Sequence, residues 1–149
     1  MANKVKFIPD GYHTVTPYLI VSRVSSLIDF LKQVFDAQER ERIQMPDGRI
    51  THAEVRIGDS VVMMGEAADS QAAMPAMLHI YLEDADAAYR RALAAGATSL
   101  REPEDQFYGD RTAGVQDAFG NQWWLATHVE DVSAEEMQRR AKAQASQPA

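Results

Sequence analysis

The 149-residue chain contains no cysteine, so disulfide frameworks, thiolate nucleophiles and thiolate metal sites are excluded. It also lacks any apolar run close to the roughly 18 to 20 residues that cross a membrane, and no apolar segment follows its N-terminal lysines as in a signal peptide. These absences predict a cytoplasmic protein without a membrane partner. A metal would have to be held by histidine, aspartate or glutamate.

Positive charge is also scarce, because 15 lysines and arginines stand against 22 aspartates and glutamates, which gives a formal net charge of -7. An acidic chain does not attract the phosphate backbone of nucleic acids or an anionic membrane surface, so neither is an expected partner. The sequence has no G-x-S-x-G elbow, phosphate-binding glycine loop or H-E-x-x-H motif. With 46% hydrophobic residues, its length suits one compact domain over residues 1–149.

Secondary-structure signals occur in the same order in both halves of the chain. Residues 12–66 predict a strand, a helix and three further strands, and residues 77–130 predict this order again after an alanine-rich linker at 67–76. A duplicated βαβββ unit predicts pseudo-twofold architecture, with a groove where the halves meet. A short appended helix is expected at residues 133–144.

The predicted helices have recognisable ends and one apolar face each. Ser25 or Ser26 is expected to cap the first helix, because a hydroxyl there accepts an unpaired amide proton of the first turn. Gly96 is expected to stop the second helix, and Ser133 and Glu136 form a capping box before the third. The residues expected on the buried faces of the first two helices are Leu27, Leu31, Val34, Phe35, Ala85, Tyr89, Ala92 and Leu93.

Side chains that alternate along a strand point to opposite faces of its sheet. In residues 49–57, Ala53 and Val55 suit packing beneath a helix. His52 and Glu54 therefore point the other way, about 6.5 to 7 Å apart along the strand. This spacing favours a hydrogen-bonded or salt-bridged network, with a metal ligand pair or a general acid and base as the alternatives.

The only two tryptophans of the chain are adjacent, so one strand would place them on opposite faces. Trp123 is expected to pack beneath a helix, and Trp124 to share the opposite face with Tyr18, Tyr81 and Met63. Large apolar side chains on a sheet face that would otherwise be exposed to solvent usually mark a pocket or an interface.

Three stretches carry a family resemblance, namely TPYLIVSRVSSLIDFLKQVF, HAEVRIGDSVVMM and GDRTAGVQDAFGNQWWLATHVEDVSAEEM. Over roughly residues 12–140 the chain resembles the glyoxalase/bleomycin-resistance/extradiol-dioxygenase group, the vicinal oxygen chelate superfamily, and more narrowly its bacterial glyoxalase-like branch. The resemblance implies an α+β fold in which two βαβββ modules form a curled mixed sheet around a cavity, with the helices outside. It also implies a homodimer. It does not fix the function, because this scaffold hosts lyases, dioxygenases and drug-sequestering proteins.

Enzymes of this family hold a divalent metal at one position on the first and last strand of each module. The resemblance places these positions on Thr16, Met63, Met77 and Trp124, none of which is a carboxylate or an imidazole. A slip of two residues would bring in His79, which supplies one ligand of the several needed. No metal cofactor is therefore expected at the family position.

The sequence favours a metal-independent protein that binds an aromatic or amphipathic small molecule in the cavity between the modules. The alternative is a glyoxalase-like lyase or isomerase, or a dioxygenase, with a divalent metal at a non-standard site or with acid and base groups on His52, Glu54 and His79. A third alternative is a protein that works through its dimer surface. The expected ligand-binding residues are Tyr18, His52, Glu54, Met63, His79, Tyr81, Arg111 and Trp124.

Structural roles are the competing interpretation for several of these side chains. Glu54 would then pair with Arg56 or Arg111, or Arg111 would pair with Asp110 on the surface. His128 is expected to meet solvent near the end of its strand. The tyrosines would pack between modules with their hydroxyls at the rim.

Overall fold

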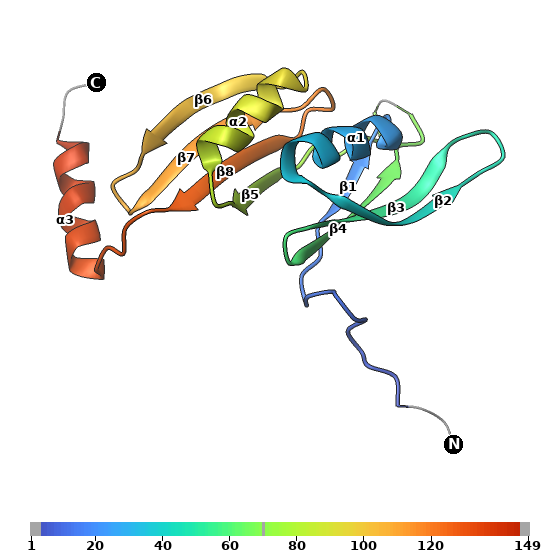
Figure 1. The fold of residues 1–149 in the computed structure, drawn as a ribbon, viewed down its shortest axis with the longest axis horizontal. Coiled ribbons are helices and arrows are strands. Elements are labelled where there is room, and N and C mark those ends of the chain that lie inside the picture. The colour runs from blue at the N-terminus through green and yellow to red at the C-terminus, as the bar shows by residue number, and fades with distance from the viewer. Residues whose placement is uncertain (1–3, 70, 147–149) are drawn as a thin grey trace. The chain divides into compact units, whose positions relative to one another are not determined.

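The computed structural model describes residues 4–69 and 71–146 (Figure 1). The chain forms two compact units, which divide between Ala76 and Met77. Each unit contains one strand, one helix and three further strands in that order, so the α+β fold with a repeated βαβββ unit is confirmed.

The first unit is a four-stranded mixed sheet with one helix. Its elements are β1 Tyr18–Val21, α1 Val24–Phe35, β2 Gln38–Gln44, β3 Ile50–Ile57 and β4 Ser60–Glu66. The strand order is β1-β4-β3-β2, with β1 parallel to β4 and the other neighbours antiparallel. Helix α1 packs on β3 and β4 (Figure 1). Strand β1 begins only at Tyr18, directly after Pro17, which has no amide proton for a ladder.

Helix α1 buries the predicted apolar face but begins differently from the prediction. Its four expected core residues are all buried. The N-cap is Arg23, so the predicted cap at Ser25 or Ser26 is wrong, and both serines lie inside the first turn. The Glu66 carboxylate at the end of β4 accepts a hydrogen bond from the Val24 amide at 3.3 Å. The carboxylate of Glu66, 42 residues along the chain, thus takes the capping role that was expected of a serine hydroxyl in the first turn.

The second unit repeats this arrangement. Its elements are β5 Met77–Tyr81, α2 Ala85–Ala94, β6 Thr98–Asp105, β7 Asp110–Gln116, β8 Gln122–His128 and the appended α3 Ala134–Ala145. The strand order is β5-β8-β7-β6, with β5 parallel to β8, and α2 packs on β6, β7 and β8 (Figure 1). No helix in the described parts of the chain has the length and apolar composition needed to cross a membrane.

The ends of α2 and α3 largely follow the prediction. Gly96 has a positive φ of 99° and its amide bonds back to Leu93, as expected of a residue that stops a helix. Leu93 itself is 38% exposed, and Ala88 takes its place on the buried face. The Ser133 hydroxyl accepts from the Glu136 amide at 3.1 Å, which confirms this cap of α3.

Each sheet has one face beneath its helix and one that we call the helix-free face. Beneath the helices lie Ala53 and Val55 of the first unit and Trp123 and Leu125 of the second, all fully buried, as predicted. The alternate strand positions form the helix-free faces. In the first unit they include Tyr18, His52, Glu54 and Met63, and in the second Met77, His79, Tyr81 and Trp124.

Candidate functional site

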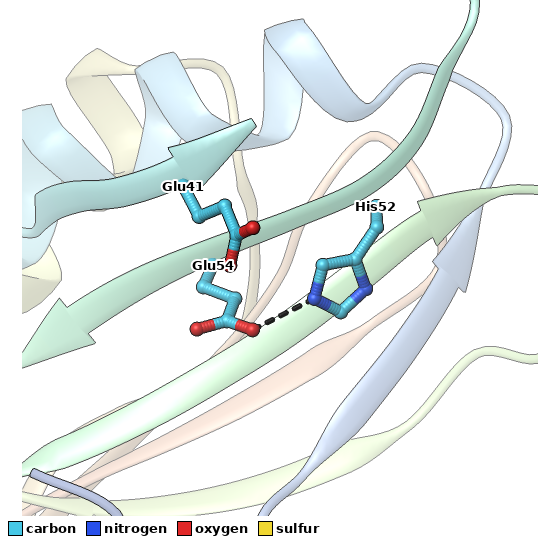
Figure 2. Close-up of side chains that lie close together, drawn as sticks. All are labelled: Glu41, His52 and Glu54. Atoms are coloured by element: carbon cyan, nitrogen blue, oxygen red, sulfur yellow. Dashed lines mark hydrogen bonds and ion pairs between the residues drawn. The ribbon is translucent and has the colours of Figure 1, made fainter. Parts of the chain in front are cut away.

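The helix-free face of the first unit carries a group that we call the His52 cluster, made of Tyr12, Tyr18, Glu41, His52 and Glu54. The His52 Nε2 atom lies 2.7 Å from Glu54 Oε2 (Figure 2). The Tyr12 hydroxyl donates to Glu54 Oε1, and the Tyr18 hydroxyl lies 3.2 Å from His52 Nδ1. Glu54 is 4% exposed, whereas His52 is half-buried. The structure thus brings His52 and Glu54 together, as their alternation in the strand allowed.

The charge state of the His52 cluster follows from these hydrogen bonds. Burial raises the pKa of Glu54, but the hydrogen bonds from His52 and Tyr12 outweigh it, so the pKa lies below its usual range. The hydrogen bond to Glu54 and burial raise the pKa of Tyr12. At neutral pH the cluster therefore holds an ionised carboxylate beside a protonated phenol.

Two members of the His52 cluster were missed by reasoning from the sequence. Tyr12 precedes β1 in an irregular segment, where no strand period applies. Glu41 lies on β2 directly opposite Glu54, but a register shift between Glu39 and Glu41 hides this pairing from simple alternation. Glu54 pairs with His52 and Tyr12, so the alternative of an Arg56 or Arg111 partner is wrong.

A second polar group lies on the helix-free face of the second unit. Asp110, which is 3% exposed, accepts from the Tyr81 hydroxyl at 2.8 Å and lies 2.8 Å from His128 Nδ1. His128 Nε2 lies 2.7 Å from Asp131. Burial raises the pKa of Asp110, but the His128 and Tyr81 hydrogen bonds outweigh it and lower the pKa. His128 is therefore held by two carboxylates instead of only meeting solvent.

The ion pairs of His128 with Asp110 and Asp131 should make the stability of the fold depend on pH. Hydrogen bonds to Asp110 and Asp131 raise the pKa of His128 above its ordinary value of 6.5. A raised folded-state pKa gives full stabilisation below about pH 6.5 and loses it as the pH rises through the folded-state value. The melting temperature of the wild type should therefore exceed that of His128→Gln by more at about pH 5.5 than at about pH 9. If the difference between the two melting temperatures stays constant or widens at high pH, the ion pairs of His128 with Asp110 and Asp131 do not stabilise the fold.

Arg111 lies on the helix side of its sheet, away from the other candidate residues of the second unit. Its guanidinium forms ion pairs with Asp86 of α2 at 2.7 Å and with Asp105 of β6 at 3.2 Å. The predicted surface pair of Arg111 with Asp110 is wrong, because adjacent strand residues point to opposite faces.

Trp124 lies flat against its own sheet. A Cβ atom on Gly114 of β7 would come within 2.6 Å of the indole ring, so only glycine leaves room for it. The Arg101 guanidinium lies 5.1 Å from the ring centroid, and the indole N–H donates to Gln122 at 3.1 Å. His79 is the register partner of Trp124 on β5, and its ring lies 5.1 Å from that of Tyr81. The indole is half-buried, which leaves part of it accessible.

The four residues that the resemblance assigns to the family metal positions present the wrong donors for a divalent ion. Thr16 precedes β1 and its hydroxyl donates to the His13 carbonyl. Met63 is the register partner of both Tyr18 and Glu54, and Met77 is 67% exposed. A hydroxyl, two thioethers and an indole do not replace the carboxylates and imidazoles that such ions require. These residues do not fit the metal of the family.

Known proteins with similar sequences and structures agree with this fold. The model of the Glyoxalase/Bleomycin resistance protein/Dioxygenase superfamily matches residues 12–125. An uncharacterised protein of Mycobacterium bovis is 36% identical over 141 residues, covering 87% of this chain and 93% of the relative. The crystal structure of TioX from Micromonospora sp. ML1 has a TM-score of 0.66 at 24% identity, covering 76% of this chain and 97% of TioX. A family enzyme from Burkholderia phytofirmans PsJN has a TM-score of 0.63 at 19% identity, over 76% and 97% of the two chains. The chain therefore belongs to the Glyoxalase/Bleomycin resistance protein/Dioxygenase superfamily.

Proposed function

We propose that this protein binds an aromatic or amphipathic small molecule without a metal, and that the ligand stacks on Trp124. The observation that carries the proposal is the accessible apolar surface of the second unit's helix-free face. Tyr81 is 63% and Met77 67% exposed there, beside the half-buried indole. Apolar and aromatic side chains gathered on an exposed sheet face are typical of a binding surface.

The polar groups of this face indicate which ligands suit it. The Tyr81 hydroxyl is engaged by Asp110, so the ring offers mainly its apolar surface. The Arg101 guanidinium lies over the indole ring and suits a planar ligand with an electron-rich or anionic edge. The His79 ring adds a donor or acceptor next to Trp124. We therefore expect a flat ring system with one polar edge, in preference to an aliphatic or cationic ligand.

The proposal is tested by titrating chelator-treated protein with a panel of planar aromatic compounds, followed by calorimetry and tryptophan fluorescence. At least one compound should bind stoichiometrically without added metal and quench the emission of the half-buried Trp124. Trp124→Ala should weaken binding about fivefold or more, since stacking on an aromatic side chain contributes about 1 to 3 kcal/mol. Trp123→Phe is the matched control, because Trp123 is fully buried on the opposite face and its variant should keep the affinity. Binding that requires a divalent metal, or that survives in Trp124→Ala, would refute the proposal.

We propose as a second candidate a glyoxalase-like lyase or isomerase, or a dioxygenase, that uses His52 and Glu54. Their 2.7 Å contact supports it, because a histidine beside an ionised carboxylate is a suitable acid and base pair. His79, the third residue of this alternative, lies on β5 of the second unit beside Tyr81. Under this proposal His52→Ala abolishes turnover in an activity screen, whereas under the first it leaves stacking at Trp124 intact.

A further inference from the structure

Two carboxylates stand directly opposite each other on neighbouring strands of the first unit. Glu41 of β2 is the register partner of Glu54 of β3. Like charges at directly opposed positions of a sheet destabilise it, and the cost grows when one of them is buried. Glu54 is 4% exposed, and in the described residues no hydrogen bond or ion pair engages the Glu41 carboxylate. The hydrogen bonds from His52 and Tyr12 already keep Glu54 ionised, and a cation between the two carboxylates would reduce their repulsion further.

The third group of this constellation is the His52 imidazole. One carboxylate oxygen each from Glu41 and Glu54 and one ring nitrogen of His52 lie within 4.8 Å of one another (Figure 2). Metal–ligand bonds of about 2.0 to 2.2 Å place two ligands of one ion roughly 3 to 4 Å apart. The three atoms therefore reach bonding distance through small rotations of the exposed Glu41 side chain and a slight opening of the His52–Glu54 contact.

Hydrogen bonds from two tyrosines orient the other ends of these ligands. The Tyr18 hydroxyl lies at His52 Nδ1, so Nε2 remains directed to Glu54. The Tyr12 hydroxyl donates to Glu54 Oε1, which leaves Oε2 for the centre of the group. Metal-binding histidines and carboxylates are typically held by such second hydrogen bonds, which fix the ring tautomer and the side-chain orientation. Exposed acidic side chains that only happen to lie close together do not usually have such orienting hydrogen bonds.

We propose that Glu41, His52 and Glu54 bind a divalent first-row transition metal. One imidazole and two carboxylates suit Mn²⁺, Fe²⁺, Co²⁺ or Zn²⁺, whereas Mg²⁺ and Ca²⁺ prefer sites made only of oxygen ligands. The site lies on β2 and β3, apart from Thr16, Met63, Met77 and Trp124. It is also independent of ligand stacking on Trp124, so either proposal can fail alone.

The test titrates chelator-treated full-length protein with Co²⁺ and Zn²⁺. Calorimetry should give one ion per chain, and Co²⁺ should produce a visible absorption band of a protein-bound ion. Glu41→Gln and His52→Gln should each weaken binding at least about tenfold, since each removes one of three ligands. Glu41 is exposed, so Glu41→Gln is expected to fold normally even if His52→Gln does not. His128→Gln is the matched control, because His128 also lies between two carboxylates but in the second unit.

Several results would overturn the metal site. Absence of saturable binding to the wild type would do so, as would unchanged binding by Glu41→Gln. Loss of binding in His128→Gln but not in Glu41→Gln would place the ion elsewhere. Titration of the Trp124 fluorescence with an aromatic ligand is repeated with Glu41→Gln. Unchanged ligand affinity in this variant keeps a failure of the metal site separate from the stacking proposal.

Discussion

Trp123→Ala should lower the free energy of unfolding by about 3 to 5 kcal/mol, the usual cost of removing a fully buried aromatic side chain. Trp123 is completely buried beneath α2, and its indole N–H donates to Asp117 at 2.9 Å. The substitution would leave a large cavity and remove one donor from a buried carboxylate. Urea unfolding followed by circular dichroism measures the effect.

The control for this experiment is the neighbouring tryptophan. Trp124→Ala should cost less than about 2 kcal/mol, because its indole is half-buried and loses only its packing on Gly114, the contact with Arg101 and the hydrogen bond to Gln122. If Trp124→Ala proved the more destabilising of the two, the assignment of faces in β8 would be wrong. An equal effect would mean that both indoles are structural, which would weaken the stacking proposal.

Asp117→Ala should destabilise the protein by a similar amount, about 3 to 5 kcal/mol, although the side chain is small. Its carboxylate is 4% exposed and accepts four hydrogen bonds, from the amides of Phe119 and Asn121 and from the Asn121 and Trp123 side chains. Hydrogen bonds to a charged acceptor contribute about 1.5 to 3 kcal/mol each, and these four are not additive because they share one carboxylate. The measurement is again urea unfolding.

Asp117→Asn separates charge from shape at this position. The amide keeps one acceptor oxygen but turns an NH₂ group toward two of the four donors, so we expect a loss nearly as large as that of Asp117→Ala. Glu135→Ala, which removes an exposed carboxylate of α3, is the control and should change stability by less than about 0.5 kcal/mol. A small effect of Asp117→Ala would show that water satisfies the turn once the carboxylate is gone.

The segment DAFGNQWW shows how one strand places two neighbouring indoles in different environments. Asp117, Gly120 and Asn121 form the turn, with Gly120 at a positive φ of 91°. Trp123 then locks this turn to the core of the second unit. Because side chains alternate, the next residue necessarily faces the other way, and Trp124 is free of this structural task.

Most predictions that needed only local periodicity were confirmed, although Leu93 of α2 is exposed. The order of strands and helices, the buried face of α1 and the burial of Trp123 all follow from periods of two or 3.6 residues, which backbone geometry imposes on any strand or helix. Predictions about partners were less successful. The cap of α1 comes from Glu66 instead of a serine, and Asp110 binds Tyr81 and His128 instead of Arg111.

The sequence by itself determined the repeated βαβββ order and the absence of thiol chemistry. Only the tertiary structure decided that Glu41 opposes Glu54 and that Tyr12 reaches the same carboxylate. The reason is physical, because a face is fixed by residue spacing alone, whereas a cross-strand partner depends on register, bulges and chain segments distant in sequence.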